Sequence, residues 1–264
     1  MARLMCIATH HKAGTVWIKR VVRQLARSLG LPWVGIWSER QLDRVPARGR
    51  AFLCNWHGRF PSAIWAREDV AFLHVVRDPR DVLLSGCAYH LKAGEKGERF
   101  LHVPRADLGG RSYQQHLNAL EDPQARLLFE MENKHAETVA EMRAWPWGDP
   151  RVAELRYEDL MQDRDGSRFE RALALLGLDA AERRAGRAAF WDNSLFGGLQ
   201  DKTARDGRLE DHIASAGRLA RWKTELPRAV GRVYAERFGA DLIALGYAKD
   251  MNWVDDLPVR PAAA

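Results

Sequence analysis

Short apolar runs alternate with segments of helical periodicity along most of the chain. The apolar runs cover residues 4–8, 33–37, 51–54, 71–76 and 152–155. After the first run, Trp17, Val21, Leu25 and Leu29 recur every four residues, which is the apolar stripe of a helix that buries one face. Strands that alternate with helices predict an α/β fold, with a central parallel sheet flanked by helices on both faces.

Further helices are predicted near residues 79–89, 113–143, 167–177, 180–190 and 219–247, the second of them broken at Asp122-Pro123. Residues 92–112 and 192–217 contain many glycines and charges and are predicted to be loops, the former a mobile loop of the kind that often covers a site. The chain shows no internal repeat and no low-complexity linker. We therefore expect a single domain over residues 1–250 and a C-terminal tail over residues 251–264.

The turn between the first strand and the first helix carries the residues of an anion site. A helix start offers unpaired backbone N–H groups and a partial positive charge. Gly14 lets the backbone approach a ligand closely, and Lys12 adds a full positive charge. Together these features predict a cradle for phosphate, the alternative being an ordinary turn with a surface lysine. The turn is not a Walker A loop, because Lys12 precedes the glycine.

Polar residues also follow the other apolar runs. His57, Arg77 and Tyr157 each come shortly after the end of a run, as Lys12 does. Ligands of parallel sheets bind beyond the C-terminal ends of the strands. We therefore expect these four side chains to converge at one edge of the sheet.

Composition and charge narrow the class of partner. The chain has 264 residues, a net charge of +6 and a pI near 9.4, which favours an anionic ligand. Acidic residues are interspersed with the basic ones, so we expect no nucleic-acid partner. Cys6, Cys54 and Cys87 are interpreted as packed thiols. Neither they nor the nine histidines have the spacing of metal ligands, so no metal is expected.

Targeting and membrane segments are not visible in the sequence. No apolar stretch approaches the length of a membrane span, and no signal peptide precedes the first strand. We therefore expect no transmembrane segment and a cytoplasmic location.

Several motifs, in order along the chain, resemble those of sulfotransferases that use 3′-phosphoadenosine 5′-phosphosulfate (PAPS). Residues 11–17, His-Lys-Ala-Gly-Thr-Val-Trp, are similar to the family's 5′-phosphosulfate loop. Residues 77–85, Arg-Asp-Pro-Arg-Asp-Val-Leu-Leu-Ser, are similar to its 3′-phosphate motif. Residues 156–160 match its RYEDL segment, residues 193–196 resemble the segment beside the adenine, and residues 217–223 resemble its C-terminal RKGxxGxWK stretch. The resemblance implies a sulfotransferase fold related to that of P-loop NTPases.

The resemblance also implies the reaction. The sulfuryl group of PAPS would pass by in-line displacement to a hydroxyl or amine acceptor, without a metal, leaving adenosine 3′,5′-bisphosphate (PAP). Lys12 is assigned to the bridging oxygen, where charge develops. Arg77 and Ser85 are assigned to the 3′-phosphate, and Ser85 also to restraining Lys12 before the acceptor binds. The implied donor-binding residues are Lys12, Ala13, Gly14, Thr15, Val16, Trp17, Arg77, Ser85, Tyr157, Leu195, Phe196, Gly217 and Arg218.

Some of these positions depart from the family pattern or have a second interpretation. Val16 stands where the family often has a second threonine, so one hydroxyl contact to the 5′-phosphate is missing. Trp17 and Tyr157, with Leu195 or Phe196, are implied near the adenine, but each could equally belong to the core. The family's C-terminal arginine falls on Ser215, and the candidates to replace its contact are Arg218, Arg208 and His212.

The acceptor must lose its proton, which requires a base. In the cytosolic branch of the family a histidine closes a Lys-Thr-His sequence after a strand. Asn55-Trp56-His57 occupies that place, so the resemblance implies His57 as the base, with Asn55 where the family has lysine. The alternatives are a structural role for His57 and a different base, for which the candidates are His10, His11, His90 and Glu95.

Two other interpretations stay open at the level of sequence. A nucleotide kinase-like phosphotransferase would need a Walker A loop and magnesium ligands. A non-catalytic nucleotide-binding protein on the same fold is the other alternative, because fold does not fix function. The acceptor, whether a small molecule, a lipid or a glycan, is not identified, and a homodimer is left open.

Overall fold

The computed structural model describes residues 2–94, 98–205 and 217–259. These residues form two compact units. The first unit consists of residues 2–77 and 144–205, and the second of residues 78–94, 98–143 and 217–259. Each unit has buried apolar clusters of its own.

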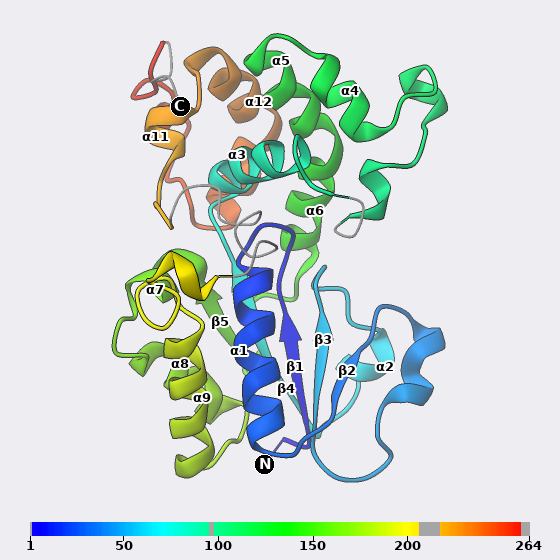
Figure 1. Cartoon of the computed structure of the whole chain (residues 1–264), viewed down its shortest axis with the longest axis vertical. Helices are drawn as coiled ribbons and strands as arrows, with labels where there is room; N and C mark the ends of the chain where they lie inside the picture. The colour runs from blue at the N-terminus through cyan, green and yellow to red at the C-terminus, as the bar shows by residue number, and fades with distance from the viewer. Residues whose placement is uncertain (1, 95–97, 206–216, 260–264) are drawn as a thin grey trace. The chain divides into compact units, whose positions relative to one another are not determined.

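The first unit is built on the predicted parallel sheet. The strands lie in the order β2-β3-β1-β4-β5, and every neighbouring pair is parallel (Figure 1). Their bounds are Leu4–Ala8 (β1), Trp33–Gly35 (β2), Ala51–Asn55 (β3), Val70–Val76 (β4) and Val152–Arg156 (β5). Every residue of β1, β3 and β4 is buried, which is why these strands read as unbroken apolar runs. The predicted α/β class is confirmed.

Helices pack on the sheet according to the alternation of side chains along the strands. The helices α1 (Thr15–Ser28), α8 (Ser167–Leu175) and α9 (Ala180–Asp192) cover one face, against Met5 and Ile7 of β1 (Figure 1). The short helix α2 (Ser62–Trp65) and Trp145 pack on the other face, against Leu4 and Cys6. The helix α7 (Tyr157–Gln162) begins as β5 ends, and 3-10 turns lie at Glu39–Arg44 and Lys202–Ala204.

The strand order creates a topological switch point between β1 and β4. The chain leaves β1 through α1 toward β2, whereas β4 has β5 on its other side. Ligands of open α/β sheets bind at the C-terminal ends of the two strands that flank such a point. The turn that carries Lys12 leaves β1 and Arg77 leaves β4, so both residues lie there.

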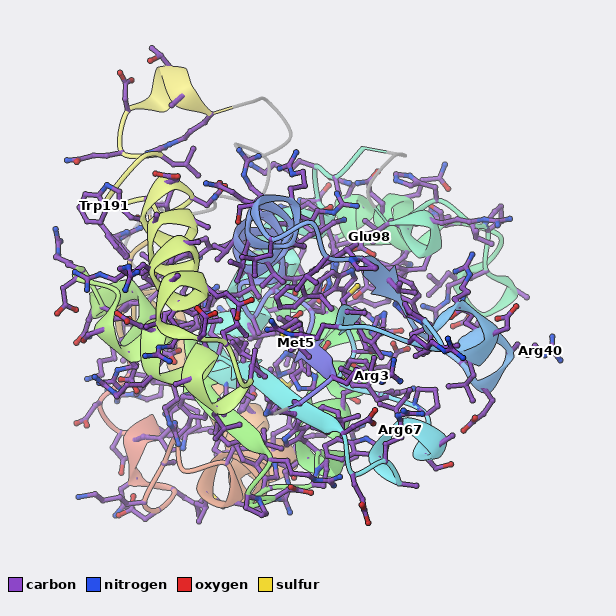
Figure 2. All side chains as sticks on the ribbon, turned by 90° about the horizontal axis from the view of Figure 1, so that it is seen from below. Arg3, Met5, Arg40, Arg67, Glu98 and Trp191 are labelled. Carbon is purple, nitrogen blue, oxygen red and sulfur yellow. The ribbon has the colours of Figure 1, made fainter. Side chains whose placement is uncertain are left out.

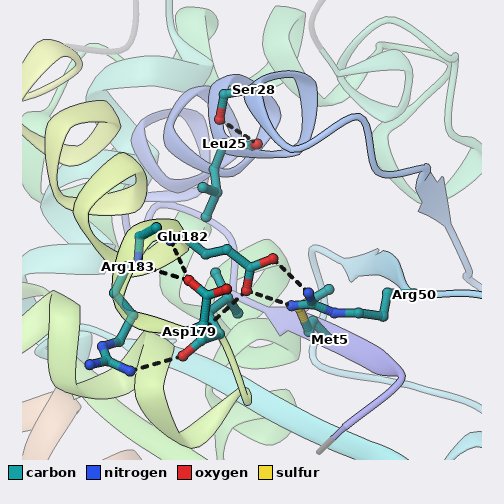
Figure 3. A network of polar contacts seen from close by, with 9 residues as sticks. Met5, Leu25, Ser28, Arg50, Asp179, Glu182 and Arg183 are labelled. Atoms are coloured by element: carbon teal, nitrogen blue, oxygen red, sulfur yellow. Dashed lines mark hydrogen bonds and ion pairs between the residues drawn. The ribbon is translucent and has the colours of Figure 1, made fainter.

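A network of polar contacts fixes the start of α9 (Figure 3). The Asp179 side chain accepts the N–H groups of Ala181 and Glu182 at 2.8 and 2.9 Å, and Glu182 accepts the Asp179 N–H at 2.9 Å in return. Glu182 also receives two hydrogen bonds from Arg50, at 2.6 and 3.1 Å. Because Arg50 directly precedes β3, this bidentate pair fastens α9 to the sheet.

The described part of the second unit contains the remaining helices. They are α3 (Pro79–His90), α4 (Tyr113–Ala119), α5 (Pro123–Glu130), α6 (Ala136–Ala144), α11 (Trp222–Glu225) and α12 (Arg228–Ala244), with a π-helical segment at Met131–His135 and a 3-10 turn at Asn252–Val254. The predicted break at Asp122-Pro123 is confirmed, because Asp122 caps α5 by accepting the N–H of Gln124 at 2.9 Å. Trp253, Val254 and Leu257 are buried in the core of this unit, so the segment expected as a tail packs into it at least to Leu257.

Arg80 secures the start of α3. Asp78 caps the helix by accepting the N–H of Arg80 at 2.9 Å, and its two carboxylate oxygens also accept from the Arg80 guanidinium at 3.0 and 2.7 Å. The same guanidinium lies 3.5 Å from the centroid of the Trp222 ring and donates to the Tyr247 carbonyl at 2.8 Å. The predicted helix start at Asp78-Pro79 is confirmed.

Residues 92–112 hold more local structure than the sequence suggested. Short 3-10 turns occur at Arg99–Leu101 and Ala106–Leu108, and Leu101 is fully buried. Ser112 and Gln115 then form a capping box at the start of α4. The sequence did not indicate these turns within the predicted loop, because they are too short to leave an apolar period.

The burial of the cysteines and the exposure of basic side chains agree with what the composition suggests. Cys6, Cys54 and Cys87 are buried free thiols as predicted, and burial raises the pKa of the Cys54 thiol to about 12. Basic side chains such as Arg40 project outward (Figure 2). No helix within the described ranges is long and apolar enough to cross a membrane. The same ranges hold no group of three or more His, Cys, Asp or Glu side chains that could bind a metal.

Candidate active site

The turn between β1 and α1 has an unusual backbone. Lys12 and Gly14 have positive φ angles, of 58° and 90°. A lysine rarely adopts such a conformation, and residues that do are concentrated at functional sites. The His10 carbonyl closes the turn by accepting the N–H of Ala13 at 3.0 Å and the hydroxyl of Thr15 at 2.8 Å. No described side chain caps the start of α1, and the N–H groups of an uncapped helix start are the kind of donors that anions bind.

Gly14 is required by its neighbour as well as by its conformation. A Cβ atom at this position would lie 2.8 Å from Cδ2 and 3.2 Å from Cε2 of the Tyr157 ring. The φ of 90° would strain any other residue there. The sequence predicts a close approach of the backbone to a ligand at Gly14. In the structure, the absence of a side chain at Gly14 lets the Tyr157 ring pack against the turn.

Arg77 contacts the same turn. Its Nη1 atom donates to the Lys12 carbonyl at 3.2 Å, and its guanidinium carbon lies 4.6 Å from the centroid of the Tyr157 ring. Arg77 is 6% exposed. The structure thus brings together Lys12, Arg77 and Tyr157 from the ends of β1, β4 and β5.

Thr15, Ala13 and Val16 complete the turn. The Thr15 hydroxyl lies 2.8 Å from both the His10 carbonyl and the Thr9 hydroxyl oxygen. Its proton is used within the turn, so it must exchange that bond in order to donate to a phosphate. Ala13 is fully buried, and Val16 is half-buried.

Aromatic side chains pack behind the turn. The Trp17 ring centroid lies 6.1 Å from those of Tyr157 and Phe196, at nearly perpendicular angles, and 4.9 Å from that of Phe190. The Trp17 Nε1 group is buried and has no hydrogen-bond partner among the described residues. Three of the residues implied for the adenine thus form one cluster, and the fourth, Leu195, is half-buried beside Phe196 in the chain. The sequence missed Phe190, because the apolar stripe of α9 indicates only a core position.

His57 lies on a turn that Asn55 organises. The Asn55 side-chain oxygen accepts the N–H groups of His57 and Arg59 at 2.9 and 3.1 Å, and its amide donates to the carbonyls of Ile36 and Arg59 at 2.7 and 3.0 Å. Asn55 is 1% exposed, whereas His57 is half-buried. Asn55, which departs from the family pattern, therefore has a structural role in this chain. Asn55 pairs with Ala8 across the sheet, so its turn starts beside the Lys12 turn.

The remaining candidates lie in the second unit or outside the described residues. Ser85 lies on α3 and is 3% exposed. Gly217 has a φ of 80°, and Arg218 pairs with Glu225 at 3.1 Å. His90, an alternative base, is fully buried with its Nδ1 atom 2.7 Å from Glu130. Glu95, Arg208, His212 and Ser215 lie outside the described residues.

A surface cavity of about 540 Å³ lies elsewhere in the first unit. It is lined by residues of α9 and of the segment before α8, among them Arg164, Arg187 and Trp191. Figure 2 shows the Trp191 side chain projecting outward from α9. Lys12 and Arg77 do not line this cavity, although Phe190 belongs to both the cavity wall and the aromatic cluster.

Comparison with known proteins identifies the fold. No protein-family model and no curated protein matches the chain. The solved structure of mouse sulfotransferase SULT7A1 in complex with PAP is similar, with a TM-score of 0.59 and 15% identity, covering 91% of this chain and 84% of that one. Retinol dehydratase in complex with androsterone and PAP is also similar, with a TM-score of 0.52 and 14% identity over 91% of this chain and 80% of that one. Its complex with retinol and PAP gives a TM-score of 0.52 and 14% identity over 92% and 82%. The chain therefore has the fold of the PAPS-dependent sulfotransferases.

Proposed function

We propose that this protein is a sulfotransferase that moves the sulfuryl group of PAPS to a hydroxyl or amine of an acceptor and releases PAP. The observation that carries the proposal is the contact between Arg77 and the Lys12 turn at the switch point of the sheet. A donor with phosphate groups on both sides of its ribose needs two anion anchors. Lys12 with the start of α1 supplies one, and the planar guanidinium of Arg77 supplies the other. PAP in the structures of similar fold supports the choice of ligand.

The reaction makes one bond and breaks one. The acceptor atom attacks sulfur, the bond from sulfur to the bridging oxygen breaks, and its electron pair stays on the 5′-phosphate of PAP. Negative charge grows on that oxygen, and a cation fixed beside it lowers the barrier. We assign this role to Lys12, whose turn is held by the His10 carbonyl and by Arg77.

The acceptor's proton must go to a base within hydrogen-bond reach. We assign this role to His57, because its turn follows β3, the neighbour of β1 in the sheet. A neutral imidazole can accept a proton on its unprotonated ring nitrogen. Ser85, Gly217 and Arg218 stay predictions of the resemblance, as donor-binding residues.

Transfer of label from ³⁵S-PAPS to a panel of alcohols, phenols, amines and glycans tests the proposal. We expect labelled product with the wild type and a loss of about 100- to 1,000-fold with Lys12→Ala, the range seen when one charge-stabilising donor is removed. Lys249→Ala, which removes an exposed lysine of the second unit, is the matched control and should leave the rate unchanged. Full activity of Lys12→Ala would contradict the assigned role. PAP binding without transfer to any acceptor would favour the non-catalytic interpretation.

A further inference from the structure

Three side chains that the proposed reaction leaves unused form a chain of hydrogen bonds beneath the Lys12 turn. The Nε2 atoms of His10 and His74 lie 2.8 Å apart, and the Nδ1 atom of His74 lies 2.5 Å from Oε2 of Glu154. The other Glu154 oxygen accepts the indole N–H of Trp145 at 2.9 Å. His10 and His74 are fully buried, whereas the Glu154 side chain, on the edge strand β5, is 29% exposed. The hydrogen-bond chain therefore runs from the edge of the sheet to the turn.

Packing holds both ends of this hydrogen-bond chain in place. The His74 ring stacks on Trp145, with centroids 3.9 Å apart and an interplanar angle of 18°. The His10 ring lies against the His57 turn, since a Cβ atom on Gly58 would be 2.7 Å from its Cε1 atom. The His10 carbonyl closes the Lys12 turn. His10 thus joins the interior of the sheet to the two turns that carry Lys12 and His57.

The donors and acceptors of the chain have a defined order. When Glu154 is ionised, its oxygens accept from Trp145 and from the Nδ1–H group of His74. The Nε2 atom of His74 is then bare and must accept, so His10 carries its proton on Nε2 and is an acceptor at Nδ1. When Glu154 gains a proton, the two bonds made by His74 reverse, while Trp145 still donates to Glu154: the carboxyl donates to His74 Nδ1, and His74 Nε2–H donates to His10. The His10 proton then sits on Nδ1, so two protons shared by the three groups become three.

On the basis of the proposed function, we propose that Glu154, His74 and His10 form a proton relay that couples protonation at the sheet edge to anion binding in the Lys12 turn. One proton taken up at Glu154 changes His10 from an acceptor to a donor next to that turn. By linkage, a bound anion and the relay's proton stabilise each other to the same extent.

The surroundings of Glu154 place its proton uptake near neutral pH. Burial raises the pKa of Glu154 to about 7, against the opposing effect of the Trp145 hydrogen bond. Burial and the neighbouring His10 lower the pKa of His74, so the proton resides at Glu154. The other titratable and charged groups on the elements around the relay are His11, Lys12, His57, Arg59, Arg77, Arg156, Tyr157 and Glu158. Imidazoles as a class titrate in the same range, so the test must separate His11 and His57 from the relay.

Glu154→Gln separates the relay from the other groups. The Gln amide can accept from Trp145 through its oxygen and donate to His74 through its nitrogen, which mimics the protonated relay at every pH. PAP affinity is measured by calorimetry from pH 6 to 8 for the wild type and the variant. We expect the ratio of wild-type to variant Kd to rise with pH, by about fivefold between pH 6 and 8 if PAP raises the relay's pKa from about 7 by one unit. Effects that are common to both proteins, such as titration of the PAP phosphates, cancel in the ratio.

A control and a second readout exclude a merely structural role. Glu170→Gln removes a carboxylate of α8 in the same unit, and its Kd should follow that of the wild type at every pH. Imidazole ¹⁵N NMR at pH 8 should show the His10 proton on Nε2 in the wild type and on Nδ1 in Glu154→Gln, with no ligand present. A Kd ratio that is constant with pH, or the same His10 tautomer in both proteins, overturns the relay. If neither protein binds PAP, the proposed function fails, and the NMR comparison with inorganic pyrophosphate as the anion still decides on the relay.

Discussion

Lys12 and Gly14 have left-handed backbone conformations for different reasons. Gly14 leaves room for Tyr157, whereas Lys12 carries a side chain in a conformation that costs roughly 1–3 kcal/mol. The hydrogen bonds of Ala13 and Thr15 to His10, and of Arg77 to Lys12, hold the turn against that strain. Strain that is maintained at the end of a central strand is consistent with a turn shaped for a ligand.

Replacement of Gly14 tests how strictly the turn is built. We expect Gly14→Ala to lower the free energy of unfolding by about 1–3 kcal/mol and to weaken PAP binding, because the methyl group meets Tyr157 and φ is positive. Gly30→Ala is the matched control, since Gly30 has a φ of 62° and open space around its Cβ position. Denaturant unfolding of both variants separates the collision from the conformational effect. Equal losses at the two positions would mean that Tyr157 moves aside without penalty.

Arg77 should distinguish nucleotides by their 3′-phosphate. Charge-assisted hydrogen bonds contribute about 1.5–3 kcal/mol, so Arg77→Ala should weaken PAP by roughly 10- to 150-fold. Adenosine 5′-phosphate, which lacks the 3′-phosphate, should lose much less affinity. Calorimetric titration of both ligands gives the comparison, with the exposed Arg40→Ala as the control for net charge. Losses of equal size for the two ligands would show that Arg77 does not bind the 3′-phosphate.

At the level of elements, the sequence predicts what local chemistry and burial determine. The apolar run at residues 51–54 corresponds to β3, Ala51–Asn55. The sequence predicts this strand because a strand that is buried on both faces is apolar throughout. The helix starts at Asp78-Pro79 and Asp122-Pro123 follow from capping, which depends on adjacent residues alone. The predicted helix at 113–143 instead divides into α4, α5, a π-helical segment and α6. Where such a segment divides depends on its packing against other helices. Buried His135, for example, lies 2.9 Å from the Tyr234 hydroxyl of α12.

The candidate site was predictable only in part. Chain order places Lys12, Arg77 and Tyr157 at strand ends, and the fold brings them together. The contribution of Asn55 depends on four backbone groups whose positions the sequence does not reveal. His74 and Glu154 did leave a signal, because each is a polar residue inside an otherwise apolar run. They are directly paired in the β4–β5 register, which requires knowledge of the strand order.

The junction of α9 with the sheet gives a prediction of stability. The hydrogen bonds from Arg50 hold the pKa of Glu182 below its ordinary value. The ion pair therefore stabilises the fold above the ordinary pKa of a glutamate, and this stabilisation is lost as pH falls through the lowered pKa. We expect Glu182→Gln to lower the free energy of unfolding by about 1–2 kcal/mol at pH 7, because the ion pair is largely buried. The difference from the wild type should shrink toward pH 3. Denaturant unfolding at several pH values checks this, with the exposed Glu68→Gln as the control; a difference as large at pH 3 as at pH 7 would contradict it.

At the level of the whole molecule, Glu154 should change the pH dependence of stability in the direction opposite to that of most other shifted carboxyl groups. Most shifted carboxyl groups of this chain, such as Asp69 and Asp149, have lowered pKa values and stabilise the fold above their ordinary pKa. Glu154 has a raised pKa, so stability falls as pH rises from about 4.5 to 7, because the carboxyl ionises in the unfolded chain while it stays protonated in the folded one. Glu154→Gln should therefore gain stability relative to the wild type between pH 5 and pH 8. Thermal unfolding at the two pH values measures the change, and a gain that is the same at both would argue that Glu154 is not shifted.

Binding of the nucleotide should stabilise the folded chain without a divalent cation. A ligand that binds only the native state at 100 times its Kd adds about 2.7 kcal/mol to the free energy of unfolding. In the proposed donor site, Lys12, Arg77 and the start of α1 supply the positive charge for the phosphates, so EDTA should leave the PAP-induced rise in melting temperature unchanged. Lys12→Ala combined with Arg77→Ala should remove most of that rise, whereas adenosine, which has no phosphate, should produce little in any variant. A rise that EDTA cancels and magnesium restores would instead favour a metal-dependent nucleotide site and count against sulfuryl transfer from PAPS.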